Sequence, residues 1–163
     1  MNHHLYFHIV WTTRDSRRLI TRDVAVFLDR ILRAIAKQER TQILALGMVM
    51  THVHLLVRSH PMTAVPRLLQ RLKGASSALA GRELQLPRDT QLYWAQGYTI
   101  HTVSPSAVEK VLDYVRNQTE RHPHDAITGW SGNPEDSLNV EATTRELGED
   151  MACLERAKEL GSG

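Results

Sequence analysis

Two apolar runs in the middle of the chain, QILALGMVM at residues 42–50 and HVHLLVR at residues 52–58, decide the fold. Both runs are rich in apolar and β-branched residues, as buried strands are. Only Thr51 separates them, so they are expected to pair as a hairpin that turns at Met50 and Thr51. This hairpin predicts an antiparallel sheet at the centre of the protein.

Regular elements are expected on both sides of the hairpin. Upstream, residues 5–13 (LYFHIVWTT) are aromatic and β-branched and predict a strand. Residues 23–40 carry apolar side chains at helical spacing behind the capping residue Thr21, which predicts an amphipathic helix. Downstream, residues 63–82 predict a second helix and residues 92–103 predict a further strand.

A third helix is expected after that strand. The strand itself is expected to break near Gly97, and Ser104-Pro105 is a favourable helix start with serine as the cap. The helix is expected to run to about Arg121, because His122-Pro123 stops it.

The first six elements follow one another in the order strand, helix, strand, strand, helix, strand. This order predicts an α+β fold of the ferredoxin-like βαββαβ type, with one antiparallel sheet and both helices on one face. The opposite face of the sheet is then free for a ligand or for the third helix.

Composition excludes several classes of protein. The 163 residues are 42% hydrophobic and 23% charged, as expected for a water-soluble globular domain. Cys153 is the one cysteine, so neither an intramolecular disulfide nor a cysteine-rich zinc site is possible. No apolar run approaches the roughly 18 residues of a membrane span, and the first residues do not resemble a secretory signal. We therefore expect a cytoplasmic protein without a membrane partner.

Charge divides the chain into two parts. Residues 1–124 hold 17 Lys+Arg and 9 Asp+Glu, whereas residues 125–163 hold 3 and 9. We expect a basic domain over residues 1–124 that meets a polyanion, followed by an acidic extension over residues 125–163 with a helix near residues 141–160. Most of the basic residues are arginine, which favours forked contacts to phosphate. A solvated basic surface without a partner would have the same charge.

His52 and His54 are the sharpest local feature. Side chains two residues apart on a strand point to the same face, so both imidazoles can converge on one ion. Two imidazoles leave a divalent ion open to oxygen ligands, including phosphate. The alternative for such a short motif is a pair of structural histidines.

Tyr114 and Gln118 are the second feature. They lie four residues apart and hence on one face of the expected third helix. A phenol can act as a covalent nucleophile, and an amide oxygen can add a hard ligand to a metal site. The alternative is a half-buried packing tyrosine beside a solvated glutamine.

Two further segments could serve DNA binding. Lys73-Gly74 forms a small basic break in the second helix, and YWAQGY at residues 93–98 supplies aromatic faces on which bases could stack. Both could equally be parts of the core. The remaining histidines with no distinctive spacing receive no role: His3, His4, His8, His101, His122 and His124.

Taken together, these segments resemble the single-tyrosine transposases with a His-hydrophobic-His motif. This family comprises the transposases of the smallest bacterial insertion sequences and the REP-associated tyrosine transposases. The resemblance covers about residues 5–121. It rests on five segments in matching order: FHIVWTT (7–13), MTHVHLLV (50–57), LQRLKGASS (69–77), YWAQGY (93–98) and YVRNQ (114–118).

The resemblance implies a βαββαβ domain that acts as a homodimer on single-stranded or hairpin DNA. Tyr114 would attack the scissile phosphate and give a 5′-phosphotyrosine and a free 3′-OH. His52, His54 and Gln118 would hold one Mg²⁺ or Mn²⁺. Because a phosphotyrosine keeps the energy of the broken phosphodiester, no nucleotide cofactor is expected. Residues in the matching segments become candidates for DNA contact: Arg71, Lys73, Trp94, Tyr98 and Arg116.

One position departs from the family pattern. Members usually carry Asn or Asp immediately before the first motif histidine, where this chain has Thr51. The change removes no ligand. Two alternatives to a transposase are a domesticated, non-transposing DNA-binding protein of the same fold and a sheet that binds RNA by stacking. The intact set of His52, His54, Tyr114 and Gln118 favours the enzyme, because binding alone does not need it.

Overall fold

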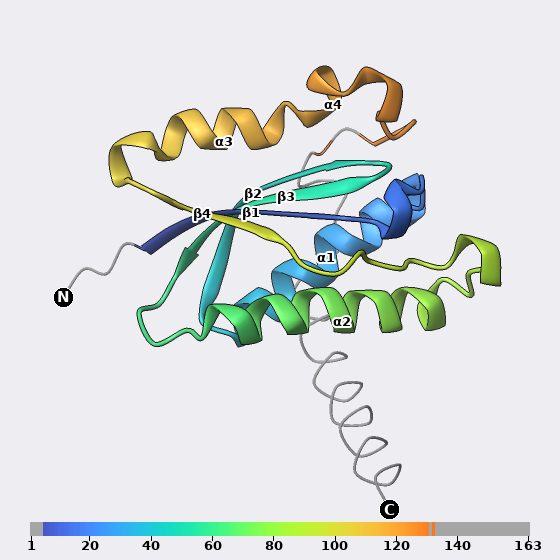
Figure 1. Ribbon diagram of the computed structural model, residues 1–163, viewed down its shortest axis with the longest axis horizontal. Helices are drawn as coiled ribbons and strands as arrows, with labels where there is room; N and C mark the ends of the chain where they lie inside the picture. The colour runs from blue at the N-terminus through green and yellow to red at the C-terminus, as the bar shows by residue number, and fades with distance from the viewer. Residues whose placement is uncertain (1–4, 131, 133–163) are drawn as a thin grey trace, which may run out of the picture.

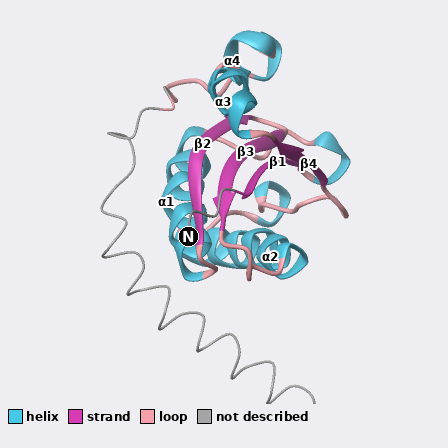
Figure 2. Ribbon diagram, turned by 90° about the vertical axis from the view of Figure 1, so that its left-hand side faces the viewer, coloured by secondary structure: helices cyan, strands magenta, loops and turns pink. Residues whose placement is uncertain are grey.

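The computed structural model has one sheet of four antiparallel strands in the order β2-β3-β1-β4, with helices on both faces (Figures 1 and 2). It describes residues 5–130 and residue 132. The strands are β1 (Leu5–Thr12), β2 (Thr41–Val49), β3 (His52–Ser59) and β4 (Thr99–Val103). The predicted α+β fold and antiparallel sheet are confirmed, including the hairpin that turns at Met50 and Thr51.

Two long helices cover one face of the sheet, as the βαββαβ order predicts (Figure 1). They are α1 (Arg22–Gln38) and α2 (Val65–Glu83). The backbone N–H of Val24 donates to the Thr21 hydroxyl, which caps α1 and stabilises it by about 1 kcal/mol. Pro66 lies in the first turn of α2, where its missing N–H costs no helical hydrogen bond.

The main hydrophobic core fills the space between these helices and the sheet. Each element contributes the apolar residues of its inward face, because strands alternate with period two and helices with period 3.6. Trp11 of β1 meets the ring of Trp94 edge-on at a centroid distance of 5.7 Å. The other large, fully buried side chains include Ile9, Leu28, Ile31, Leu32, Ile35, Met48, Leu55, Leu68 and Leu69.

The third helix lies on the opposite face of the sheet and is broken. After a 3₁₀ turn at Pro105–Ala107, α3 spans Val108–Arg116 and α4 spans Gln118–Arg121. The prediction of one continuous helix to Arg121 is therefore wrong. Asn117 leaves the helical conformation at the break (φ −94°, ψ 26°), and the Tyr114 carbonyl accepts a hydrogen bond from the Gln118 side chain there.

The fourth strand is shorter than predicted. Only Thr99–Val103 joins the sheet, whereas the preceding segment touches β1 through an isolated bridge between Thr13 and Trp94. Lys73 Nζ donates to the carbonyl oxygens of Ala95 and Gly97, which keeps this segment out of the ladder. Gly97 supplies a φ of 81° at the point where the chain bends into β4.

The chain after α4 returns to the main core. Ile127 and Trp130 are buried in it, and the N–H of Met50 donates to the Asp125 carbonyl at 2.8 Å. The expected helix near residues 141–160 and most of the acidic extension lie outside the described residues. No helix in the described part of the chain is long and apolar enough to cross a bilayer.

Candidate active site

The two motif histidines project from the sheet face that α3 covers. His54 pairs with Gly47 of β2 on one side and with Val10 of β1 on the other. Residues at alternate positions share a face, so His8 and Val10 of β1 lie on the same face as His54. The predicted convergence of His52 and His54 is therefore observed.

A row of imidazole rings forms on this face. The rings of His52 and His54 meet edge-on with centroids 5.1 Å apart. The rings of His8 and His54 lie end to end with centroids 5.3 Å apart, and His8 Nε2 lies 3.0 Å from His54 Nδ1. On the other side, His122 meets His52 edge-on at 4.9 Å.

Burial favours the neutral form of three of these rings, those of His54, His52 and His8. It lowers the pKa of His54 to about 3, with the neighbouring histidines adding to the effect. Burial also lowers the pKa of His52 and that of His8, with His122 and His101 as the respective second causes. A neutral imidazole has a lone pair, which is the form that binds a metal ion.

Tyr114 lies against this row. Its ring meets those of His8 and His54 edge-on at 5.7 and 5.8 Å. The guanidinium of Arg121 covers the tyrosine at 4.4 Å from the ring centroid, which is a favourable cation–π distance. The proposed nucleophile and the motif histidines thus come together within one chain.

Gln118 is buried, with only 1% of its surface exposed. Its Nε2 donates to the Tyr114 carbonyl oxygen at 2.8 Å. Its Oε1 is buried and has no hydrogen-bond partner among the described residues. A buried, unsatisfied acceptor is costly, so it indicates a group that completes the site.

Gly47 provides the seat for this part of the site. A Cβ added at Gly47 would lie 1.9 Å from the Val115 carbonyl oxygen and 2.9 Å from Cγ of Gln118. The junction of α3 and α4 therefore rests directly on the backbone of β2. Because Gly47 pairs with His54 across the sheet, the seat brings Gln118 beside the histidine pair.

The residues present fit a hard divalent metal ion. Nδ1 of His52 is hydrogen-bonded to the Thr51 hydroxyl at 3.0 Å, and Nδ1 of His54 to His8. This leaves Nε2 of both rings for a metal, the usual arrangement around histidine ligands. Among the described residues no three His, Cys, Asp or Glu side chains form a metal-binding group. The buried Oε1 of Gln118, which has no hydrogen-bond partner among them, is an oxygen donor of the kind that a hard divalent ion accepts.

Some of the side chains predicted to contact DNA are exposed, and the others are held by contacts within the protein. Tyr98 and Arg116 are exposed. Lys73 uses its ammonium to hold two carbonyls, and burial lowers its pKa. Arg71 is paired with Glu39. Trp94 is buried, and its indole N–H donates to the Ser76 hydroxyl.

Three site residues were not assigned a role from the sequence: His8, Arg121 and His122. His8 carries no spacing signal of its own, because it reaches the site through the pairing of β1 with β3. Arg121 and His122 arrive through the break at Asn117, which the helical pattern does not reveal.

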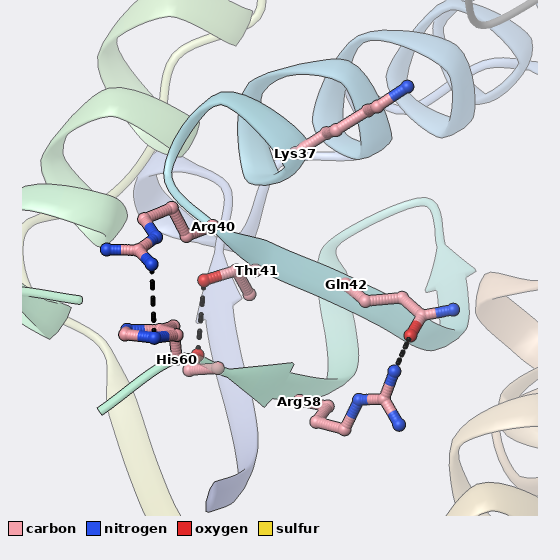
Figure 3. A pocket seen from close by; sticks show the side chains of 7 residues that line it. Lys37, Arg40, Thr41, Gln42, Arg58 and His60 are labelled. Atoms are coloured by element: carbon pink, nitrogen blue, oxygen red, sulfur yellow. Dashed lines mark hydrogen bonds between the residues drawn. The ribbon is translucent and has the colours of Figure 1, made fainter. Parts of the chain in front are cut away.

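A second polar site lies at the other end of the β2–β3 hairpin (Figure 3). It is a pocket of about 530 Å³ lined by Lys37, Arg40, Thr41, Gln42, Arg58, Ser59 and His60. Arg58 donates to the Gln42 side-chain oxygen at 2.8 Å, and Arg40 lies 3.1 Å from the His60 ring (Figure 3). The described lining contains no carboxylate, so the pocket is positively charged.

Comparison with known proteins shows which proteins this chain is similar to. The chain is 29% identical over 120 residues to the ISDra2 transposase TnpA of Deinococcus radiodurans, covering 72% of this chain and 86% of that protein. A crystal structure of a transposase candidate from the same species superposes with a TM-score of 0.57 at 30% identity, covering 72% and 93% of the two chains.

A more distant structure has the same fold. It is a REP-associated tyrosine transposase bound to a REP hairpin, with a TM-score of 0.57, 12% identity and coverage of 75% and 72%. The family model described as "Transposase IS200 like" matches residues 1–118, well over half of the chain. The protein therefore belongs to the IS200-like family of single-tyrosine transposases.

Proposed function

We propose that this protein cleaves and rejoins single-stranded DNA through a covalent bond to Tyr114. The observation that carries the proposal is the contact of the Tyr114 ring with the rings of His54 and His8, at 5.8 and 5.7 Å. A phenol beside two neutral imidazoles and an orphaned amide oxygen has the parts of a phosphoryl-transfer site. Membership of a transposase family supports the same reaction class.

In the proposed reaction, Tyr114 Oη attacks the scissile phosphorus. The O–P bond to tyrosine forms as the P–O3′ bond breaks, the phenol loses its proton, and the 3′ oxygen leaves as a hydroxyl. The products are a 5′-phosphotyrosine and a free 3′-OH. Attack by a 3′-OH on the phosphotyrosine reverses the step, so strand joining needs no nucleotide cofactor.

His52, His54 and Gln118 are the residues that would hold Mg²⁺ or Mn²⁺. Such an ion, when bound, stabilises the charge that develops on the phosphate oxygens. The protein's own part is to orient the reacting groups. The Arg121 guanidinium packs on the Tyr114 ring, limits its rotation and places a positive charge beside the reacting phosphate.

The DNA partner is proposed to extend beyond the reacting phosphate. The exposed Tyr98 and Arg116 can meet the strand, and the positive pocket at Lys37, Arg40 and Arg58 fits the backbone of a longer substrate such as a hairpin stem. We further propose that the protein acts as a homodimer in the cytoplasm.

Covalent capture tests the reaction. The protein is mixed with single-stranded oligonucleotides taken from the DNA that flanks its gene, with Mg²⁺ or Mn²⁺, and resolved on a denaturing gel. A shifted adduct that disappears in chelator supports the enzyme. Tight hairpin binding without an adduct supports the domesticated binding protein instead. Tighter binding of single-stranded RNA than of DNA would favour an RNA-binding sheet.

A further inference from the structure

We propose that His8 is a positioning residue that fixes the tautomer of His54 and so makes His54 Nε2 available to the metal. The inference rests on the proposed function, because it concerns the same metal site. It adds a residue that lies outside the His-hydrophobic-His motif and comes from another strand.

The contact is specific in its atoms. His8 Nε2 and His54 Nδ1 lie 3.0 Å apart, and the planes of the two rings are inclined by only 20°, as an in-plane hydrogen bond requires. A hydrogen bond between two neutral imidazoles has one proton between the facing nitrogens. If His8 carries it, the proton of His54 must sit on Nε2. If His54 Nδ1 carries it, His54 Nε2 has a free lone pair.

Only the second arrangement can bind a metal at the atom that the site leaves open. His8 then accepts at Nε2 and carries its own proton on Nδ1. Histidine ligands in metal sites generally donate their second ring N–H to such a partner.

The neighbouring ligand has an equivalent partner. Nδ1 of His52 faces the Thr51 hydroxyl at 3.0 Å, so each motif histidine has its Nδ1 occupied by a different side chain. Thr51 is the position that departs from the usual family residue. Both rings are thus held through Nδ1, which leaves Nε2 as the open nitrogen of each.

His8 also touches the proposed nucleophile. Its ring meets Tyr114 edge-on at 5.7 Å while its Nε2 faces His54. One side chain therefore contacts both the proposed ligand and the proposed nucleophile. Loss of the His8 side chain is expected to disturb metal binding more than the position of Tyr114, because the hydrogen bond to His54 is directional and the edge contact with Tyr114 is not.

The test reads the tautomer directly, without DNA. The full-length protein is labelled with ¹⁵N, and two-bond ¹H–¹⁵N spectra at pH 7.5 assign which nitrogen of His54 is protonated in the metal-free state. We expect Nδ1–H. Protonation at Nε2 in the unaltered protein would overturn the inference, and this measurement needs no variant.

Variants then separate the hydrogen bond from simple packing. The leucine side chain of His8→Leu cannot accept a hydrogen bond, so we expect His54 to shift toward the Nε2–H form. The Mn²⁺ affinity, measured by calorimetry, should then fall by about 10- to 100-fold. His8→Gln can accept through its amide oxygen and should keep the affinity within about threefold. Equal loss in His8→Gln and His8→Leu would assign His8 to packing and overturn the inference.

His101→Leu is the matched control. His101 is the cross-strand partner of His8 on β4, is exposed, and has no hydrogen bond to His54 in the described structure. We expect no change in tautomer or affinity. If unaltered protein binds Mn²⁺ and forms the DNA adduct while His8→Leu changes neither tautomer nor affinity, the inference about His8 fails and the proposed function stands. If unaltered protein forms no adduct, the proposed function fails, and the tautomer measurement still decides the role of His8.

Discussion

The side chain of Gln118 turns back along the chain and donates from Nε2 to the carbonyl oxygen of Tyr114, at 2.8 Å. The bond spans the break between α3, which ends at Arg116, and α4, which begins at Gln118. Because the amide nitrogen donates to this carbonyl, the side-chain oxygen is the atom that the proposed metal site would use. The bond thus connects the helix break with the proposed ligand.

Replacement of Tyr114 by phenylalanine tests the nucleophile. Tyr114→Phe removes only the hydroxyl, so we expect covalent DNA capture to fall to the level of a protein-free control. The ring contacts with His8 and His54 remain, and the unfolding free energy should change by less than about 1 kcal/mol. Adduct formation on the denaturing gel is the measurement. A persistent adduct would reassign the nucleophile.

Replacement of His54 by alanine tests the metal site. Loss of a side chain that only supports a metal ligand typically lowers metal affinity by about 10- to 100-fold. His54→Ala removes a proposed ligand itself, so we expect it to lower Mn²⁺ affinity by more than this. DNA cleavage should fall with it. Calorimetric titration and the adduct assay at increasing Mn²⁺ measure both. Unchanged cleavage in the presence of chelator would contradict the assignment.

Replacement of Gly47 by alanine tests the seat of the α3–α4 junction. The new Cβ would meet the Val115 carbonyl oxygen at 1.9 Å, so the junction must move away from β2. A displacement of about 1 Å is expected to slow adduct formation by about 100-fold. Gly74→Ala is the matched control, because a Cβ there meets nothing within 4 Å. Equal rates for the two variants would show that the seat is unimportant.

Acidification should destabilise the metal-free protein through His54. Burial lowers the pKa of His54 to about 3, whereas an unfolded histidine titrates near 6.5. Between these values the unfolded state binds a proton that the folded state does not. The unfolding free energy therefore falls as the pH drops from 6.5 toward 3, by a few kcal/mol in total. Urea unfolding in chelator from pH 7 to 4.5 measures the slope, and His54→Ala should flatten it. Identical slopes would contradict the prediction.

The positive pocket should contribute phosphate contacts. We expect Arg40→Ala and Arg58→Ala each to weaken hairpin binding at low salt and to reduce the slope of log affinity against log salt by about 1. Fluorescence anisotropy between 50 and 300 mM salt, about the range in which such contacts weaken, is the measurement. Arg88→Ala, on the exposed turn Arg88–Thr90, is the control. A slope that all three variants leave unaltered would exclude the pocket from the DNA path.

Much of the fold could be predicted from local pattern. The hairpin, both long helices and the antiparallel sheet follow from apolar periodicity and from capping residues such as Thr21. The errors arose where side chains compete for backbone groups. Lys73 takes the carbonyls of Ala95 and Gly97, and Gln118 takes that of Tyr114. The bonds of Lys73 depend on tertiary placement and that of Gln118 on its side-chain conformation, and the apolar periodicity encodes neither.

The candidate site shows the same division. His52 and His54 could be paired from the period of a strand, and this pairing is observed. The position of His8 depends on the register in which β1 meets β3, and that of Arg121 on a break within a helix. Neither the register of a strand pair nor a break within a helix is marked by a motif in the sequence. The absence of a side chain at Gly47 has structural meaning only when α3 is in place.

The shallow packing of α3 has a consequence for local stability. Val115 is its one buried residue, whereas α1 buries ten. The helix that carries Tyr114 can therefore open in a sub-global fluctuation while the sheet and the main core stay folded. Its amide protons should exchange with solvent well before those of β1 and β3. We expect such an opening to uncover the histidine row at a small fraction of the unfolding free energy of the protein.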